Sequence, residues 1–343
     1  MLISKIQKPL LYTNTMKTVL SSLFVLIAVF RLTGQNPYSE SISMSDCKAR
    51  LYYLASPELE GRGTGQIGQR LAAEYIAREF EKLGLLPLVC SAEKNYFQKF
   101  KYNTVDSTEN VLGFIPADKA DAEWIVLTAH YDHLGKTEEG IFYGADDNAS
   151  GTTAVLEIAE AFSMAKQNGV KLNKNLLFIA YSAEELGLLG SEYYVKSALG
   201  KSMNYILNVN MDMIGKSIRY GMVETFVKMN DAGFKEDPEM KQDYVYLFKK
   251  GKSTGKYAHL ARKSARKQKI RIDTTPGLLL RMTYKTSSDH KHFADAGVPV
   301  MVFFTGLHPD YHTVRDTPDK IDYENLTSVI KIIFETVYTI ASE

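Results

Sequence analysis

The chain has 343 residues, 45% of them apolar, which is enough to bury one large α/β core or two small ones. Its 41 Lys and Arg residues against 40 Asp and Glu leave a formal net charge of +1, which gives no electrostatic footprint for nucleic acid or for an anionic membrane. The one basic run, residues 263–271, is typical of a solvated helix face followed by a strand.

The N-terminus is predicted to lie outside the folded part of the chain. Lys17 precedes a short apolar stretch, Val19–Phe30, which small and polar residues follow. This pattern is typical of a secretory signal peptide, and the stretch is short for a membrane span. An N-terminal membrane anchor is the alternative. We therefore expect an extension with a signal peptide at 1–34, one domain at 35–343, export to the periplasm or the medium, and no stable membrane association afterwards.

Two cysteines, Cys47 and Cys90, lie in the predicted domain. Export permits a disulfide between them, but two thiols do not demand one. Neither lies in a CxxC pair or beside a histidine motif, so a catalytic or metal role is not predicted for either cysteine.

Strands and helices are predicted to alternate along the domain. In chain order they are helices 45–54 and 66–83, strands 111–115 and 125–129, helix 150–166, strand 175–182, helix 188–198, strand 205–211, helices 256–269 and 288–295, strand 298–304 and helix 323–342. This alternation predicts an α/β fold with a mostly parallel, twisted, mixed sheet and helices on both faces. Residues 216–284 show the weakest pattern, and we expect them to hold loops that shape a substrate pocket.

Acidic and histidine residues follow or interrupt the apolar runs of this pattern. They are His130, Asp132, Asp146, Asp147, Glu184, Glu185, Asp212 and His312. In open α/β sheets, sites are built at the carboxyl ends of the strands. Mixed histidine and carboxylate ligands suit a hydrolytic centre of the zinc type.

Some of these residues also have an ordinary structural explanation. Acids are favoured at helix starts, as for Glu184 and Glu185, and Asp147 or Asn148 could cap the helix that follows them. An unpaired acid at the end of an apolar strand, such as Asp212, is costly and a cation would relieve that cost. Because several motifs share the same position at strand ends, we favour a metal site.

The motifs AHYDHLG, GADDNASG, SAEELGLLGS, NMDMIG, SDHKHF and YHTVRDTPDKI, in this order, resemble the M28 family of metallopeptidases, the co-catalytic dizinc aminopeptidases. The resemblance covers residues 56–65 and 109–319. It implies a zinc-exopeptidase fold of the phosphorylase/hydrolase-like type and two Zn²⁺ ions, for which Co²⁺ or Mn²⁺ could substitute. His130, Asp147 and Asp212 would bind one ion, and Asp147, Glu185 and His312 the other, with Asp147 bridging.

The resemblance also implies the roles of other residues. Glu184 would be the general base that takes a proton from a water shared by both ions, with peptides as substrates and N-terminal residues as products. Asp132 would support His130, and Asp316 would support His312, with a cis peptide after Asp147. Ser288 and Asp289 would lie near the site, where Ser288 would help to bind the oxyanion. Three further histidines are expected to be structural: His133, His290 and His292.

Three other activities remain open from the sequence. A glutaminyl cyclase shares the fold but uses one zinc ion, and a binding ectodomain on the same scaffold would have lost its ligands. A carboxypeptidase or dipeptidase of the same clan is the third, because the loops that select the substrate terminus show no readable pattern. A count of bound metal ions separates the aminopeptidase from the first two.

Overall fold

The computed structural model describes residues 36–88, 95–102, 105–220, 241–274 and 287–343, together with residues 225, 227, 228, 231 and 235. The predicted signal peptide and Cys90 lie outside these residues. Cys47 is buried and forms no disulfide with another described residue. Within the described part of the chain, no helix has the length and apolar character needed to span a membrane.

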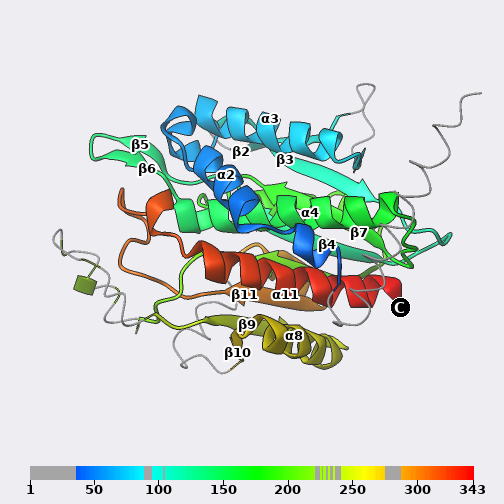
Figure 1. The fold of residues 1–343 in the computed structure, drawn as a ribbon. Coiled ribbons are helices and arrows are strands. Elements are labelled where there is room, and N and C mark those ends of the chain that lie inside the picture. The colour runs from blue at the N-terminus through cyan, green and yellow to red at the C-terminus, as the bar shows by residue number, and fades with distance from the viewer. Residues whose placement is uncertain are drawn as a thin grey trace, which may run out of the picture.

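A nine-stranded mixed sheet forms the centre of the fold, as the sequence predicts (Figure 1). Its order is β1-β3-β7-β4-β8-β11-β9-β10, and β2 pairs with β3. The strands are β1 (Leu86–Pro87), β2 (Phe97–Tyr102), β3 (Val105–Ile115), β4 (Trp124–His130), β7 (Asn175–Tyr181), β8 (Tyr205–Met211), β9 (Tyr244–Lys250), β10 (Arg271–Asp273) and β11 (Val300–Phe304). The central strands β7, β4, β8 and β11 are parallel, whereas β3 and β9 run antiparallel to their central neighbours. A separate hairpin, β5 (Gly135–Thr137) with β6 (Gly140–Phe142), follows β4.

Helices cover both faces of the sheet. They are α2 (Met44–Leu54), α3 (Ile67–Lys82), α4 (Gly151–Gln167), α5 (Leu189–Lys196), α6 (Ala198–Lys201), α8 (Thr254–Gln268), α10 (His290–Asp295) and α11 (Tyr323–Ser342). Figure 1 shows α2, α3, α4, α11 and α8 over one face, with α4 beside α11. Because strand side chains alternate between faces, Ile125 and Leu127 pack under these helices, while Val126 packs with the layer that includes Tyr194 and Phe293 of α5 and α10.

Two parts of the sheet differ from the sequence prediction. Apart from the helix predicted at 256–269, residues 216–284 were expected to hold loops, but β9 and β10 also lie there, and β9 buries aromatic residues on one face and aliphatic residues on the other. A short run that is apolar on both faces lacks the polar alternation that signals a strand. The first half of β3 was missed because its buried residues are polar and bond to polar side chains of neighbouring segments: Thr108 Oγ1 lies 2.6 Å from Ser182 Oγ, and Asn110 donates to Gln98 of β2.

Candidate metal centre

The parallel pairing of β4 with β8 brings His130 and Asp212 side by side. Thr128 and Asn210 are register partners, so His130 and Asp212, each two residues further on, lie on the same face at the same level. The Asp212 Oδ1 atom is 3.6 Å from His130 Nε2. Below them, a buried polar ladder crosses the two strands: Thr128 donates to Asn210 Oδ1 at 2.7 Å, and Asn208 donates to Thr128 at 3.0 Å.

A short π-helical turn, Ala145–Ser150, carries Asp147 into the space above these strand ends. Asn148 anchors the turn, because its Oδ1 accepts from Gly151 N at 2.9 Å and its Nδ2 donates to the Met211 carbonyl at 3.0 Å. Asn148 thus bonds to the first residue of α4, whereas the N-cap position itself is Ser150, which makes no side-chain cap bond. The Asp147–Asn148 peptide bond is cis, as the family resemblance implied.

The carboxylate of Asp147 faces two groups of ligand-type side chains. Its Oδ1 is 3.3 Å from His130 Nε2, and its Oδ2 is 3.0 Å from His312 Nε2. Glu185 Oε2 is 3.2 Å from the same atom of His312. The ligand atoms of His130, Asp147 and Asp212 all lie within 4.8 Å of one another. One carboxylate therefore lies between two candidate cation positions.

The charges of this cluster fit the binding of cations. Asp147, Glu184, Glu185 and Asp212 have side chains between 5% and 12% exposed, and among the described residues no lysine or arginine forms an ion pair with them. Burial works to lower the pKa of His130, but the surrounding carboxylates raise it well above its ordinary value. Burying several carboxylates without compensating charge is costly, so this donor set suits divalent cations of the zinc type.

Glu184 lies beside the His130 side of the cluster, with its Oε2 3.9 Å from His130 Nε2. Burial, reinforced by the neighbouring acids, raises the pKa of Glu184 well above its ordinary value. Asp132 supports this residue more directly than it supports His130: its Oδ1 accepts from Glu184 N at 3.2 Å, and its Oδ2 accepts from Thr64 Oγ1 at 2.8 Å. His130 Nδ1 is closer to the backbone oxygen of Asp132, at 3.2 Å, than to its carboxylate, at 3.8 Å.

Two predicted supporting residues have other contacts than expected. Asp316 does not bond to His312; its carboxylate accepts from the backbone N–H groups of Asp146 and Asp147, at 3.0–3.1 Å, and so holds the turn. Ser288 is fully buried, and its hydroxyl accepts from Asn210 Nδ2 at 2.9 Å as the end of the polar ladder. The hydroxyl of Ser288 therefore lies within the core, and its contacts give no support to the oxyanion role, which stays a prediction.

Asp289 and the three histidines expected to be structural are placed differently from one another. Burial raises the pKa of Asp289 to about 7, and it lies in the core next to Ser288. His290 and His292 belong to α10, and neither is a member of the metal-binding groups found among the described residues. His133, in contrast, lies within the centre, where it bonds to Glu185.

Arg62 and Tyr311 were not identified from the sequence. Arg62 is fully buried, and its guanidinium donates to the carbonyls of Tyr131 at 2.7 Å, Tyr143 at 2.8 Å and Gly144 at 2.9 Å, and also to that of Leu54. The only sequence signal for it was a glycine-rich turn. Tyr311 stacks on His312 with ring centroids 3.7 Å apart, and only its adjacency to that histidine could have pointed to it.

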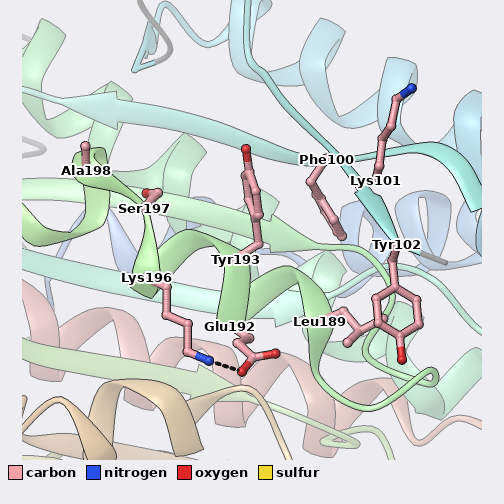
Figure 2. Close-up of a pocket in the computed structure, with 9 residues that line it drawn as sticks. All are labelled: Phe100, Lys101, Tyr102, Leu189, Glu192, Tyr193, Lys196, Ser197 and Ala198. Carbon is pink, nitrogen blue, oxygen red and sulfur yellow. Dashed lines mark hydrogen bonds and ion pairs between the residues drawn. The ribbon is translucent and has the colours of Figure 1, made fainter.

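A cavity of about 470 Å³ lies between β2 and α5 (Figure 2). Phe100 and Tyr193 stack in its wall with centroids 5.0 Å apart, and Glu192 and Lys196 form an ion pair across α5. None of the predicted ligands lines this cavity. The candidate chemistry therefore rests on the buried cluster at the strand ends and not on this surface cavity.

Comparison with known proteins agrees with this geometry. The family model described as "Peptidase family M28" matches residues 110–337. Aminopeptidase YwaD of Bacillus subtilis is 30% identical over 254 residues, which is 72% of this chain and 48% of YwaD, so this chain spans about half the length of that relative.

Solved structures share the fold. The LapA aminopeptidase of Legionella pneumophila has a TM-score of 0.67 at 21% identity, covering 90% of this chain and 74% of LapA. BSAP, a zinc aminopeptidase from Bacillus subtilis, has a TM-score of 0.62 at 19% identity, covering 88% of this chain and 96% of BSAP. With the family model spanning most of the sheet and every predicted ligand, the chain belongs to peptidase family M28.

Proposed function

We propose that the chain is a zinc-dependent aminopeptidase that removes N-terminal residues from peptides and binds two zinc ions. The observation that carries the proposal is the carboxylate of Asp147, whose two oxygens face His130 and His312 separately. Each half is completed by one more carboxylate, Asp212 on the first side and Glu185 on the second. The similarity to YwaD and to zinc aminopeptidase structures supports the same activity.

Zinc, when bound, would supply a Lewis acid that activates water and polarises the scissile carbonyl. Glu184 takes the proton of the attacking water as the water oxygen bonds to the carbonyl carbon. Glu184 then delivers this proton to the leaving nitrogen as the C–N bond breaks. The carboxylate of Asp132 accepts a hydrogen bond from the backbone N–H of Glu184, and thereby fixes the backbone position from which the Glu184 side chain extends. The chain's own contribution is thus a positioned base beside a cluster that collects the cations.

The test uses purified protein and a panel of aminoacyl-nitroanilides, each with a free or an acetylated amino group. We expect cleavage of the free-amino substrates only, loss of activity with a chelator, and two zinc ions per chain by elemental analysis. Glu184→Gln should lower kcat by about 10²–10⁴-fold while retaining both ions. Glu192→Gln is the matched control, since Glu192 forms an ion pair with Lys196 on the surface of α5 and with no other described residue.

The outcomes separate the competing activities. One bound ion together with cyclisation of N-terminal glutamine would show that the chain is a glutaminyl cyclase and not an aminopeptidase. Absence of bound metal would show that it is a non-catalytic binding module. Two ions with cleavage from the carboxyl terminus would keep the metal centre and change the substrate class.

We also propose that the chain is exported, with the signal peptide in residues 1–34 removed from a domain that begins near Gln35. The apolar stretch after Lys17 supports this proposal. N-terminal sequencing of the protein recovered from the periplasm or medium should start near residue 35. Recovery of the intact N-terminus in the membrane fraction would show an anchor instead.

A further inference from the structure

His133 is held rigidly at the edge of the candidate metal centre. It is 1% exposed, its backbone N–H donates to the Arg62 carbonyl at 3.2 Å, and it forms a parallel bridge with Gly63. Its ring packs on Gly144, where an added Cβ would lie 2.5 Å from the ring carbon Cγ. The imidazole therefore has little room to turn.

Among the described residues, the ring of His133 makes one short polar contact, and that contact lies inside the centre. Its Nδ1 is 2.8 Å from Glu185 Oε1, and the next carboxylate oxygen, Asp147 Oδ2, is 3.8 Å away. Its Nε2 is buried without a hydrogen-bond partner among the described residues. A histidine that only supported the scaffold would be expected to bond to the scaffold. This ring instead donates its Nδ1 proton to a predicted metal ligand, since a carboxylate can only accept.

Glu185 is consequently held between two imidazoles, one for each oxygen. Oε1 accepts from His133, whereas Oε2 lies 3.2 Å from His312 Nε2. The two rings have centroids 5.7 Å apart and are inclined at 64°. Only Oε2 is therefore directed toward the position shared by His312 and Asp147.

We infer that His133 is a positioning residue for the second metal ion: its Nδ1–H fixes Glu185 Oε1 and thereby presents Oε2 alone to the ion. This inference rests on the proposed dizinc centre. Hydrogen bonds from outside a metal site that orient its ligands raise metal affinity by about 10–100-fold. The chemistry resembles a carboxylate–histidine pair in which the carboxylate, and not the imidazole, is the metal ligand.

The test compares His133→Ala, His133→Asn and His259→Ala, the last as a control in the exposed part of α8. Zinc affinity is measured by competition with a chromophoric chelator, and coordination by the visible spectrum of the Co²⁺-loaded protein. We expect His133→Ala to weaken one of the two ions by about 10–100-fold. His133→Asn should restore most of that affinity with an unchanged cobalt spectrum, because its amide nitrogen can donate from nearly the position of Nδ1.

Other outcomes overturn the inference in distinct ways. If His133→Asn loses the second ion as His133→Ala does, and the cobalt spectrum changes, His133 is itself a ligand. If both variants bind two ions as tightly as the wild type, His133 has no positioning role, although the dizinc centre stands. If the wild type binds fewer than two ions, the proposed function fails first. Thermal unfolding of the metal-free variants shows whether each is folded, and His133→Leu serves as a second donor-free variant of closer volume.

Discussion

Replacing Arg62 by methionine is expected to destabilise the fold, because this side chain joins three separate segments from inside the core. Its guanidinium donates to carbonyls at the end of α2, after β4 and before the Asp147 turn. Among the described residues, no other donor reaches the carbonyls of Tyr131, Leu54 and Tyr143, whereas Gly144 O also accepts from Ala149 N at 3.1 Å.

The magnitude follows from the two buried carbonyls that would lose their donor, those of Tyr131 and Leu54; the bond to Tyr143 is only partly buried. Each buried, unpaired acceptor costs about 1–3 kcal/mol, so Arg62→Met should cost roughly 2–6 kcal/mol. Burial of the guanidinium lowers the pKa of Arg62 to about 10, which shows that burying this charge opposes folding. Removing the guanidinium therefore offsets part of the stability lost with its hydrogen bonds. We therefore expect a decrease of about 2–3 kcal/mol in the free energy of unfolding. Arg62→Lys should lose nearly as much, since one ammonium cannot serve all of these carbonyls.

The assay is urea unfolding of the metal-free protein, read as a lower midpoint at an unchanged slope. Arg78→Met is the control, because Arg78 is 55% exposed and, within the described part of the chain, forms an ion pair only with Glu74; it should change stability by less than about 0.5 kcal/mol. A midpoint for Arg62→Met equal to that of the wild type would refute the reasoning. It would mean that the guanidinium contributes no more than the cost of its burial.

Three further predictions follow from the centre and its supports. Chelation should lower the thermal unfolding midpoint and zinc should restore it, since a ligand at 100 times its Kd adds about 2.7 kcal/mol to stability; an unchanged midpoint would argue against a folded-state metal site. Asp316→Asn, which leaves one oxygen to accept from the amides of Asp146 and Asp147, should weaken zinc by about 10–100-fold in calorimetric titration. Ser288→Ala should leave kcat unchanged but lower the free energy of unfolding by about 1 kcal/mol, because it deprives Asn210 of an acceptor; a large fall in kcat would reinstate an oxyanion role.

The central strands and the residues at their ends could be predicted because both leave a local signature. An apolar run that ends in His130 or precedes Asp212 shows the strand and the candidate ligand together. β9 could not be predicted in this way, because both of its faces are apolar and its pairing with β11 is set by residues 50 or more positions away.

The supporting contacts could not be predicted, because they depend on which distant segments meet. Asp316 was assigned to His312 through the family resemblance, yet its carboxylate reaches backbone amides 169 and 170 positions earlier. His133 was considered structural because nothing in the sequence shows that its ring lies against Glu185. Ser288 was placed in the site by its motif, while its bond to Asn210 places it in the core.

The buried ladder of Asn208, Thr128, Asn210 and Ser288 has a consequence for how the sheet assembles. A slip of one residue between β4 and β8 would shift the strands by about 3.3 Å and turn every side chain to the opposite face. Amides and hydroxyls would then be stranded in an apolar layer, so the misaligned sheet would be penalised during folding. Leucine or valine at these positions would leave no polar group unpaired after such a slip, so they would not penalise the misaligned register. Polar residues in the core thus make correct alignment of the strands, and hence of His130 with Asp212, a condition of folding.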